Sequence, residues 1–274
     1  YSGQAYRRSN NSKESIINDQ VGLEIIGSKK KLSDDKEIIN TILKSIDKIK
    51  IKNVSINIGD VSLFRQLIDS LNMPERWKLR LIRHFWRPKY FEDLLNRLET
   101  NSDIDPITVD FDKKKFSEMK KLNQNQEIAG RKISEILSRF DKKIRDPRSF
   151  AEGKKTAKII REFLKISCPI DQMDKNLNKF FKKNNIKKNI IKNLLPMKNL
   201  SKSDYKIIFS TNFGRDIEYY TGMVFDIWAS TNKNKQEIAR GGRYDNLLKS
   251  LGSKKDVSAV GAAINLNNLS RLMQ

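Results

Sequence analysis

Apolar residues at every second position predict strands in three parts of the chain, residues 20–27, 54–58 and 220–228. Residues 1–8 also resemble a strand, and a polar stretch at residues 9–19 separates them from the next one. The two flanking strands are therefore expected to form an antiparallel pair. Its polar side chains would face one side of a sheet.

Apolar residues three and four positions apart predict helices at residues 34–50 and 63–71. Asp34 and Glu37 have the spacing of a capping box, which places the start of the first helix at Asp34. Pro74 is suited to the first turn of a third helix. Helices thus alternate with the predicted strands in the first hundred residues.

The middle of the chain, residues 101–202, is helical in pattern and rich in lysine. Residues 116–140 and 156–164 alternate apolar stripes with charge, and residues 175–198 place lysine pairs between apolar residues. Such a pattern is typical of a solvated helical lid or of an interface. The segment contains no recognised nucleic-acid motif.

Three polar residues of the first strand pair are candidates for a pocket wall: Arg7, Gln20 and Glu24. Gln20 and Glu24 are an even number of positions apart, so both point to one face of an unbroken strand. The alternative is that all three lie on an ordinary polar surface.

A second group of candidates lies in residues 214–226 and 239–247. Arg215 and Tyr220 lie just ahead of a strand, and a glycine pair precedes Tyr244. Glycines let the backbone approach a ligand closely. A cation, phenols and close backbone suit a small zwitterion that carries a ring. A glycine turn between two core strands would have the same pattern.

Composition narrows the classes of protein only in part. The formal net charge of +22 and the isoelectric point near 9.9 favour anionic partners, but the lysine excess accompanies many Ile and Asn residues and also fits compositional bias. The sequence contains neither a long apolar run nor a signal peptide, so we expect no membrane span. A single cysteine, Cys168, indicates a reducing, cytoplasmic setting. The lone histidine, His84, lacks partners for a metal site, so no metal is expected.

Two ordered motifs resemble the signatures of histidyl-tRNA synthetases. Residues 215–225, RDIEYYTGMVF, are similar to the pattern R-G-L-D-Y-Y-x-x-x-V-F, and residues 241–247, GGRYDNL, are similar to G-G-R-Y-D-x-L. The resemblance implies an α+β fold: a class II synthetase-like core, with an antiparallel sheet flanked by helices and a helical insertion. The implied divisions are residues 1–100 for the first part of the core, 101–204 for the insertion and 205–274 for the end of the core.

Two further motifs of the same family are present in altered form. Arg7, Gln20 and Glu24 match its motif 2 strands. Residues 258–272 resemble its motif 3 as a strand running into a helix, but Asn265, Asn267 and Asn268 replace its glycine, glutamate and arginine. In the family the arginine lies against ATP, and asparagine offers phosphate no cation. Neither motif 1 nor an anticodon-binding domain is found between Tyr1 and Gln274, and a chain that begins with Tyr is expected to be a fragment or a trimmed product.

The chain keeps the motifs for the amino acid and lacks those for ATP. In this combination it resembles the regulatory subunits of ATP phosphoribosyltransferase, a catalytically silent branch of the synthetase family. The resemblance implies a role in the first step of histidine biosynthesis. The partner would be the short-form catalytic subunit, L-histidine would be the effector, and the chain would form a homodimer within a hetero-oligomer. No catalytic residue, cofactor, membrane contact or tRNA partner is expected. The alternatives are a diverged or fragmentary histidyl-tRNA synthetase and a synthetase-like RNA-binding protein.

The resemblance also implies which residues bind histidine. Glu24 would hold the α-amino group, Arg215 would face the carboxylate, and tyrosines would shape the imidazole end. Three neighbours, Asp216, Tyr219 and Arg243, are expected to pack or hydrogen-bond nearby. The full set of expected histidine-binding residues is Arg7, Gln20, Glu24, Arg215, Tyr220 and Tyr244.

Overall fold

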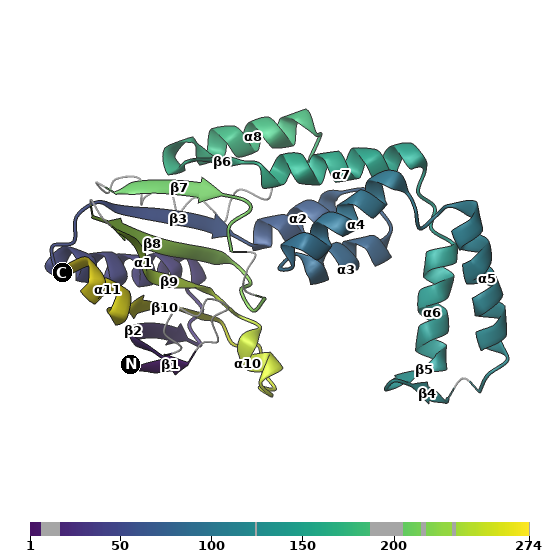
Figure 1. Cartoon of the computed structure of the whole chain (residues 1–274), viewed down its shortest axis with the longest axis horizontal. Helices are drawn as coiled ribbons and strands as arrows, with labels where there is room; N and C mark the ends of the chain where they lie inside the picture. Colours follow the sequence, from purple (N-terminus) through teal and green to yellow (C-terminus); the bar gives the residue numbers. More distant parts are fainter. Residues whose placement is uncertain (7–16, 124, 187–204, 215–217, 232–233, 274) are drawn as a thin grey trace. The chain divides into compact units, whose positions relative to one another are not determined.

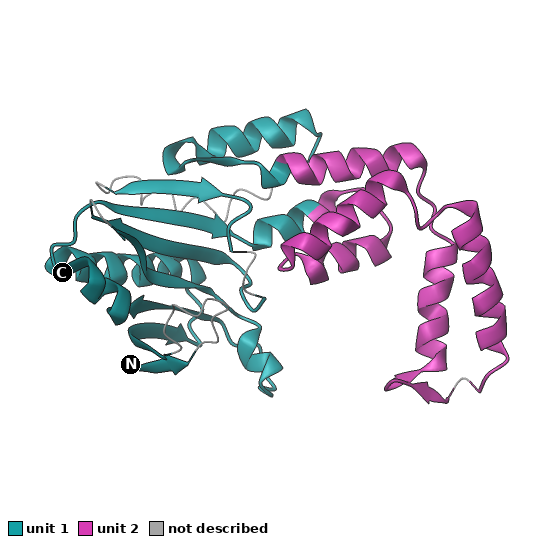
Figure 2. Ribbon diagram, viewed as in Figure 1, with its two compact units in different colours: residues 1–67, 163–274 teal, residues 68–162 magenta. Residues whose placement is uncertain are grey.

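The computed structural model describes residues 1–6, 17–123, 125–186, 205–214, 218–231 and 234–273. The chain divides into two compact units (Figure 2). The first combines Tyr1–Leu67 with Phe163–Gln274, and the second is Ile68–Glu162. The second unit does not coincide with the predicted insertion at residues 101–204, and the three-part division remains a prediction.

An eight-stranded sheet forms the first unit, with β1 and β6 at its two edges (Figure 1). All neighbouring strands are antiparallel except β3 and β7, which are parallel. This mainly antiparallel sheet with its helices confirms the predicted fold class. In spatial order the strands are β1 (Ser2–Tyr6), β2 (Ile17–Ile26), β10 (Ala259–Asn265), β9 (Lys235–Arg243), β8 (Met223–Ser230), β3 (Val54–Asp60), β7 (Lys206–Ser210) and β6 (Ser167–Pro169).

Helices α1 (Lys31–Lys48) and α11 (Leu266–Met273) both contact β2, β9 and β10. The apolar stripe of α1 is buried, as its spacing predicts. The helix begins three residues before Asp34, and no side chain caps its first turn, so the predicted capping box is wrong. Asp34 is instead a buried residue of the first helical turn. Between Ser167–Pro169 and β7 the first unit also contains η1 (Ile170–Gln172) and α8 (Met173–Lys183), and α10 (Leu247–Ser250) follows β9.

The second unit is helical. Helix α2 (Ser62–Ser70) leads into it, and α7 (Phe150–Leu164) leads out of it. Its core contains the buried ring of Trp77 and the buried leucine and phenylalanine side chains of the helix at Pro88–Thr100. Between α2 and α7 the helices are α3 (Glu75–His84), α4 (Pro88–Thr100), α5 (Pro106–Lys120) and α6 (Ile133–Ile144).

The helical pattern predicted over residues 116–140 is interrupted by a short hairpin. Strands β4 (Glu127–Ile128) and β5 (Arg131–Lys132) pair antiparallel between α5 and α6. The two residues that join them, Ala129 and Gly130, both have positive φ, 51° and 72°, as a type I′ turn requires. The prediction of helix there was wrong, because charge and apolar alternation do not reveal a two-residue turn.

A buried ion network ties the loop before α7 to α3. Arg148 binds Asp103 at 3.0 Å and Asp146 at 3.0 Å, and Arg76 binds the same two carboxylates. The Trp77 indole nitrogen also donates to Asp146 at 3.1 Å. These contacts hold the pKa of Asp146 below its usual value despite the opposing effect of burial.

None of the described helices is long and apolar enough to cross a membrane.

Candidate functional site

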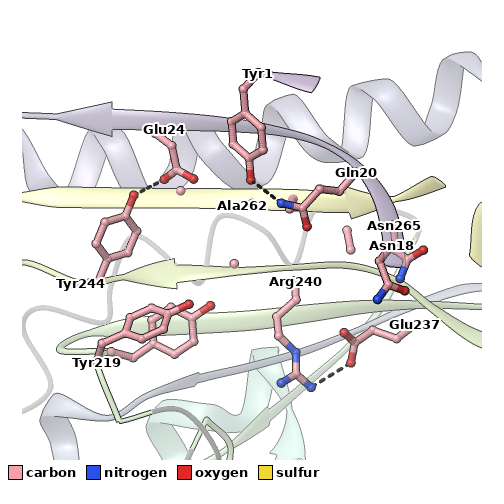
Figure 3. Close-up of a pocket in the computed structure, with 15 residues that line it drawn as sticks. Tyr1, Asn18, Gln20, Glu24, Tyr219, Glu237, Arg240, Tyr244, Ala262 and Asn265 are labelled. Carbon is pink, nitrogen blue, oxygen red and sulfur yellow. Dashed lines mark hydrogen bonds and ion pairs between the residues drawn. The ribbon is translucent and has the colours of Figure 1, made fainter. Parts of the chain in front are cut away.

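A polar pocket lies on one face of the sheet, across β2, β10 and β9 (Figure 3). Its cavity volume is about 130 Å³. Its floor is made mostly of glycine and alanine, and its rim carries carboxylate, amide, phenol and guanidinium groups. The lining residues are Tyr1, Asn18, Gln20, Glu24, Tyr219, Tyr220, Glu237, Ala239, Arg240, Gly241, Tyr244, Gly261, Ala262, Ala263 and Asn265.

Strand register explains why Glu24 enters the pocket. Glu24 pairs with Gly261 of β10, which in turn pairs with Gly242 of β9. The Glu24 carboxylate occupies the space that a side chain at position 261 would take, because a Cβ built on Gly261 would lie 1.4 Å from Glu24 Oε2. Any side chain at position 261 would push the carboxylate aside.

Tyr244 completes this end of the pocket. Its hydroxyl donates a hydrogen bond to Glu24 Oε2 (Figure 3). Partial burial raises the pKa of Glu24, and the phenol donor offsets only part of that rise. Burial and the neighbouring carboxylate also raise the pKa of Tyr244, so the phenol keeps its proton and remains a donor.

Aromatic rings form a wall beside this carboxylate. The ring centroids of Tyr219 and Tyr220 are 4.8 Å apart, and Tyr219 meets Tyr244 edge to face at 6.0 Å. The Tyr220 ring packs directly over Gly242, where an added Cβ would lie 2.8 Å from it. The glycine pair is therefore inside strand β9 and makes room for rings and neighbouring strands. It does not form a turn.

The opposite rim involves the first residue of the chain. The Gln20 amide donates to the Tyr1 hydroxyl at 3.1 Å. The Tyr1 ring lies over Gly22, again where a Cβ would overlap it. Sequence reasoning identified Gln20 but not Tyr1, because a lone tyrosine ahead of a strand carries no signal of its own.

An ion pair forms the far end of the pocket. Arg240 binds Glu237 at 2.8 Å (Figure 3), and its guanidinium lies 3.9 Å from Asp226 of β8. A bulge in β9 opposite Ile227 and Trp228 places Arg240 and Glu237 on the same face although they are three residues apart. Sequence analysis missed both residues, since regular alternation would have placed them on opposite faces.

The neighbouring Arg243 does not line the pocket, and its guanidinium donates hydrogen bonds to three other residues. It donates to Asp35 at 2.8 Å, to Asp245 at 2.9 Å and to the Lys31 carbonyl at 2.8 Å. Only 5% of its surface is exposed. As expected, Arg243 hydrogen-bonds near the pocket and does not line it.

The predicted site residues can now be placed. Gln20, Glu24, Tyr220 and Tyr244 come together at the pocket. Tyr219, which was expected to pack nearby, lines it as well. The three remaining predicted residues, Arg7, Arg215 and Asp216, lie outside the described residues. Within the described part of the chain, no three potential metal-ligating side chains of His, Cys, Asp or Glu come together.

The three asparagines of the altered motif 3 make structural contacts. The Asn267 side chain accepts from the Asp19 backbone at 2.7 Å, and the Asn268 amide donates to the Glu237 carbonyl at 2.8 Å. The Asn265 side chain accepts from the Asn268 backbone at 3.0 Å at the start of α11. These amides join β2, β9 and α11 at the edge of the pocket, and they bring no positive charge to it.

The fold and pocket define a class of protein, and comparison with known proteins agrees with it. The family described as histidyl-tRNA synthetase matches residues 1–269 of this chain. The chain therefore belongs to the histidyl-tRNA synthetase family. Two solved structures share the fold over essentially the whole chain. They are an ATP phosphoribosyltransferase regulatory subunit/histidyl-tRNA synthetase from Bacillus halodurans (TM-score 0.59, 17% identity, 57% of that chain) and a histidyl-tRNA synthetase from Nostoc (TM-score 0.56, 16% identity, 53% of that chain).

Curated relatives specify the branch of the family. ATP phosphoribosyltransferase regulatory subunits from Brucella anthropi and Rhizobium rhizogenes are each 24% identical, over 100% and 98% of this chain. The chain spans 76% of the length of both relatives, and little more than half of the two solved structures. The predicted resemblance to the non-catalytic, regulatory branch is confirmed.

Proposed function

We propose that this chain is a non-catalytic regulatory subunit that a short-form ATP phosphoribosyltransferase requires for activity, and that it conveys feedback inhibition by L-histidine. One observation carries the proposal. The pocket contains the Glu24 carboxylate and four phenols, which suit an amino acid, whereas the positions that handle ATP in synthetases carry asparagines that hydrogen-bond to the backbone. A pocket of that kind can sense an amino acid without activating it.

Within this proposal, the two ends of histidine meet different groups. The ammonium group binds the Glu24 carboxylate, one oxygen of which already accepts a hydrogen bond from the Tyr244 hydroxyl. The imidazole packs among Tyr219, Tyr220 and Tyr244, which form a contiguous aromatic wall. Arg215 remains the proposed partner of the ligand carboxylate, and Arg7 and Gln20 remain proposed histidine-binding residues.

Regulation requires that histidine bind more tightly to one state of the assembly than to another. We propose a homodimer of this chain within a hetero-oligomer that also contains the catalytic subunit, in a reducing cytoplasm. The proposed function requires no cofactor and no tRNA. The alternative function, that of a diverged synthetase, requires ATP to bind beside the amino acid.

Mixing the chain with the short-form catalytic subunit of the same genome tests the proposal. We expect ATP and phosphoribosyl pyrophosphate to be joined at a substantial rate only in the mixture, and histidine to suppress that rate. The catalytic subunit alone is the control. Pyrophosphate exchange into ATP by this chain alone, dependent on histidine, would instead establish the synthetase alternative.

A further inference from the structure

Arginines cluster on one short segment of the second unit. Residues 76–87 contain four arginines and one lysine, although lysines outnumber arginines by about two to one in the whole chain. A bias toward lysine codons would therefore not produce this cluster. The segment comprises α3 and the turn that leads to α4.

The four arginines have different roles. Arg76 is bound inside the unit by Asp103 and Asp146. Arg80 donates to the Tyr90 hydroxyl at 3.3 Å. The other two, Arg83 and Arg87, are exposed, and neither forms an ion pair with an acidic residue in the described part of the chain.

Aromatic and apolar groups lie among these cations. The Arg87 guanidinium carbon is 4.3 Å from the centre of the Trp86 ring, a stacked cation–π contact. Leu79 is 59% exposed and lies one helical turn before Arg83. We call this group the α3 surface, defined as Leu79, Arg80, Arg83, Trp86, Arg87, Lys89 and Tyr90.

The arginines of the α3 surface affect the pKa of Tyr90, which belongs to the same surface. The hydrogen bond from Arg80 lowers the pKa of Tyr90, and the charges of Arg80, Arg97 and Arg87 add to that effect. The nearest carboxylate along α4 does not neutralise the surface, because Glu92 is bound to Arg161 at 2.8 Å. The surface therefore presents the cations of Arg83 and Arg87 beside the exposed side chain of Leu79 and the half-buried ring of Trp86.

Its composition favours a protein partner over RNA. Arginine, tryptophan and tyrosine are enriched at protein–protein interfaces and in their energetic centres, whereas lysine is depleted there. RNA phosphates also accept two parallel hydrogen bonds from arginine, so the feature that favours a protein partner is the exposed apolar side chain of Leu79 among the cations. A planar guanidinium also pairs with a carboxylate through two parallel hydrogen bonds.

We propose that the α3 surface binds a patch of the catalytic subunit that carries carboxylates. The arginines would pair with these carboxylates, and Leu79 and Trp86 would pack against apolar side chains at the centre of the patch. This inference rests on the proposed function, since it assigns the surface through which that function is exerted. It assigns the protein contact to residues of the second unit, none of which lines the pocket of the first unit. Binding of partner and effector would then involve separate residues.

Charge reversal on the surface tests this assignment. The double variant Arg83→Glu/Arg87→Glu changes two exposed side chains, so we expect its circular dichroism and melting temperature to match those of the parent. The matched control is Lys154→Glu/Lys158→Glu, which makes the same charge change at exposed positions of α7 in the same unit. Affinity for the catalytic subunit is measured by calorimetry at low and moderate salt.

We expect the arginine variant to bind the catalytic subunit at least about 100-fold more weakly, and the lysine control to stay within about threefold. An equal loss in both variants, or no loss in the arginine variant, would overturn the assignment. A labelled single-stranded polyuridine probe provides the RNA arm. Loss of polyuridine binding with unchanged affinity for the catalytic subunit would make this an RNA surface and would also overturn it.

A parent chain that neither binds nor activates the catalytic subunit would instead refute the proposed function. That outcome is separate from failure of the surface assignment, in which the parent binds and the arginine variant binds equally well.

Discussion

Arg243 and Tyr244 are neighbours in one signature motif, yet they belong to different parts of the molecule. Arg243 is buried and bound to two carboxylates and a carbonyl. Tyr244 faces the open pocket and donates to Glu24. Both residues match the same family signature. The match therefore does not distinguish residues that hold the fold from residues that meet a ligand, whereas burial and partners do.

The difference predicts opposite consequences of mutation. Around Arg243, removal of the guanidinium leaves the buried carboxylate of Asp35 without its cation. Around Tyr244, removal of one group leaves the other groups in contact with solvent. Damage at the first place should appear as lost stability, and damage at the second as lost binding.

Arg243→Leu should have the largest effect. It leaves the Asp35 carboxylate without its cation, whereas Asp245 keeps its ion pair with Lys31, and breaking a buried ion pair such as Arg243–Asp35 costs about 3–5 kcal/mol in the free energy of unfolding. Urea denaturation followed by circular dichroism measures the change. Tyr244→Phe is the control and should alter stability by less than about 1 kcal/mol, since the hydroxyl lies at the rim of the pocket. Similar losses in the two variants would remove the distinction.

Two glycines that line the pocket, Gly241 and Gly261, sharpen the same comparison. A Cβ on Gly241 would lie 2.5 Å from both the Ala262 Cβ and the Gly261 carbonyl, so Gly241→Ala strains the sheet and should cost about 1–3 kcal/mol. A Cβ on Gly261 meets the end of the flexible Glu24 side chain. Gly261→Ala should therefore cost less stability but displace the carboxylate and abolish histidine binding.

Denaturation and calorimetry on the two glycine variants separate these effects. Gly241→Ala at subdenaturing temperature serves as the control for binding. A Gly261→Ala protein that still bound histidine at parental affinity would show that Glu24 does not hold the ligand.

The smallest effect concerns pH. Asp60 is buried near Asp35, and burial raises its pKa to about 6. The folded state therefore takes up a proton near pH 6, whereas the unfolded chain does so only near about pH 4. Stability from this group should rise as pH falls from about 6 to about 4, by at most about 1.4 kcal/mol per pH unit.

Asp60→Asn removes that titration and keeps an acceptor for the Ser62 backbone, which donates to Asp60 at 2.8 Å. The difference in unfolding free energy between the two proteins should then narrow as the pH is lowered through 6. A difference that stays constant with pH would show that Asp60 titrates normally.

Much of the sheet was predictable because its strands alternate regularly. The strands Ile17–Ile26 and Val54–Asp60 occur where alternating apolar residues predict them. The final strand and helix occur where the apolar run after Ser258 and the resemblance to motif 3 predict them. The prediction of helix over residues 116–140 was wrong at a two-residue turn, where Ala129 and Gly130 have positive φ. Such a turn depends on backbone geometry, which the spacing of apolar residues does not reveal.

The pocket was predictable only where its residues lie on regular strands. Gln20 and Glu24 share a face because their separation is even, and they line the pocket together. Arg240 and Glu237 were missed because a bulge reverses the alternation between them. Tyr1 was missed because its position depends on the absence of a side chain at Gly22, which is distant in sequence.

The proposed function requires that the pocket bind an amino acid and no longer bind a nucleotide beside it. Calorimetric titration of the chain with L-histidine, and separately with ATP, tests this requirement most directly. We predict saturable histidine binding that weakens by at least about tenfold in Glu24→Gln, and no ATP binding. Saturable ATP binding by the chain, or histidine affinity that is unchanged in Glu24→Gln, would contradict the account.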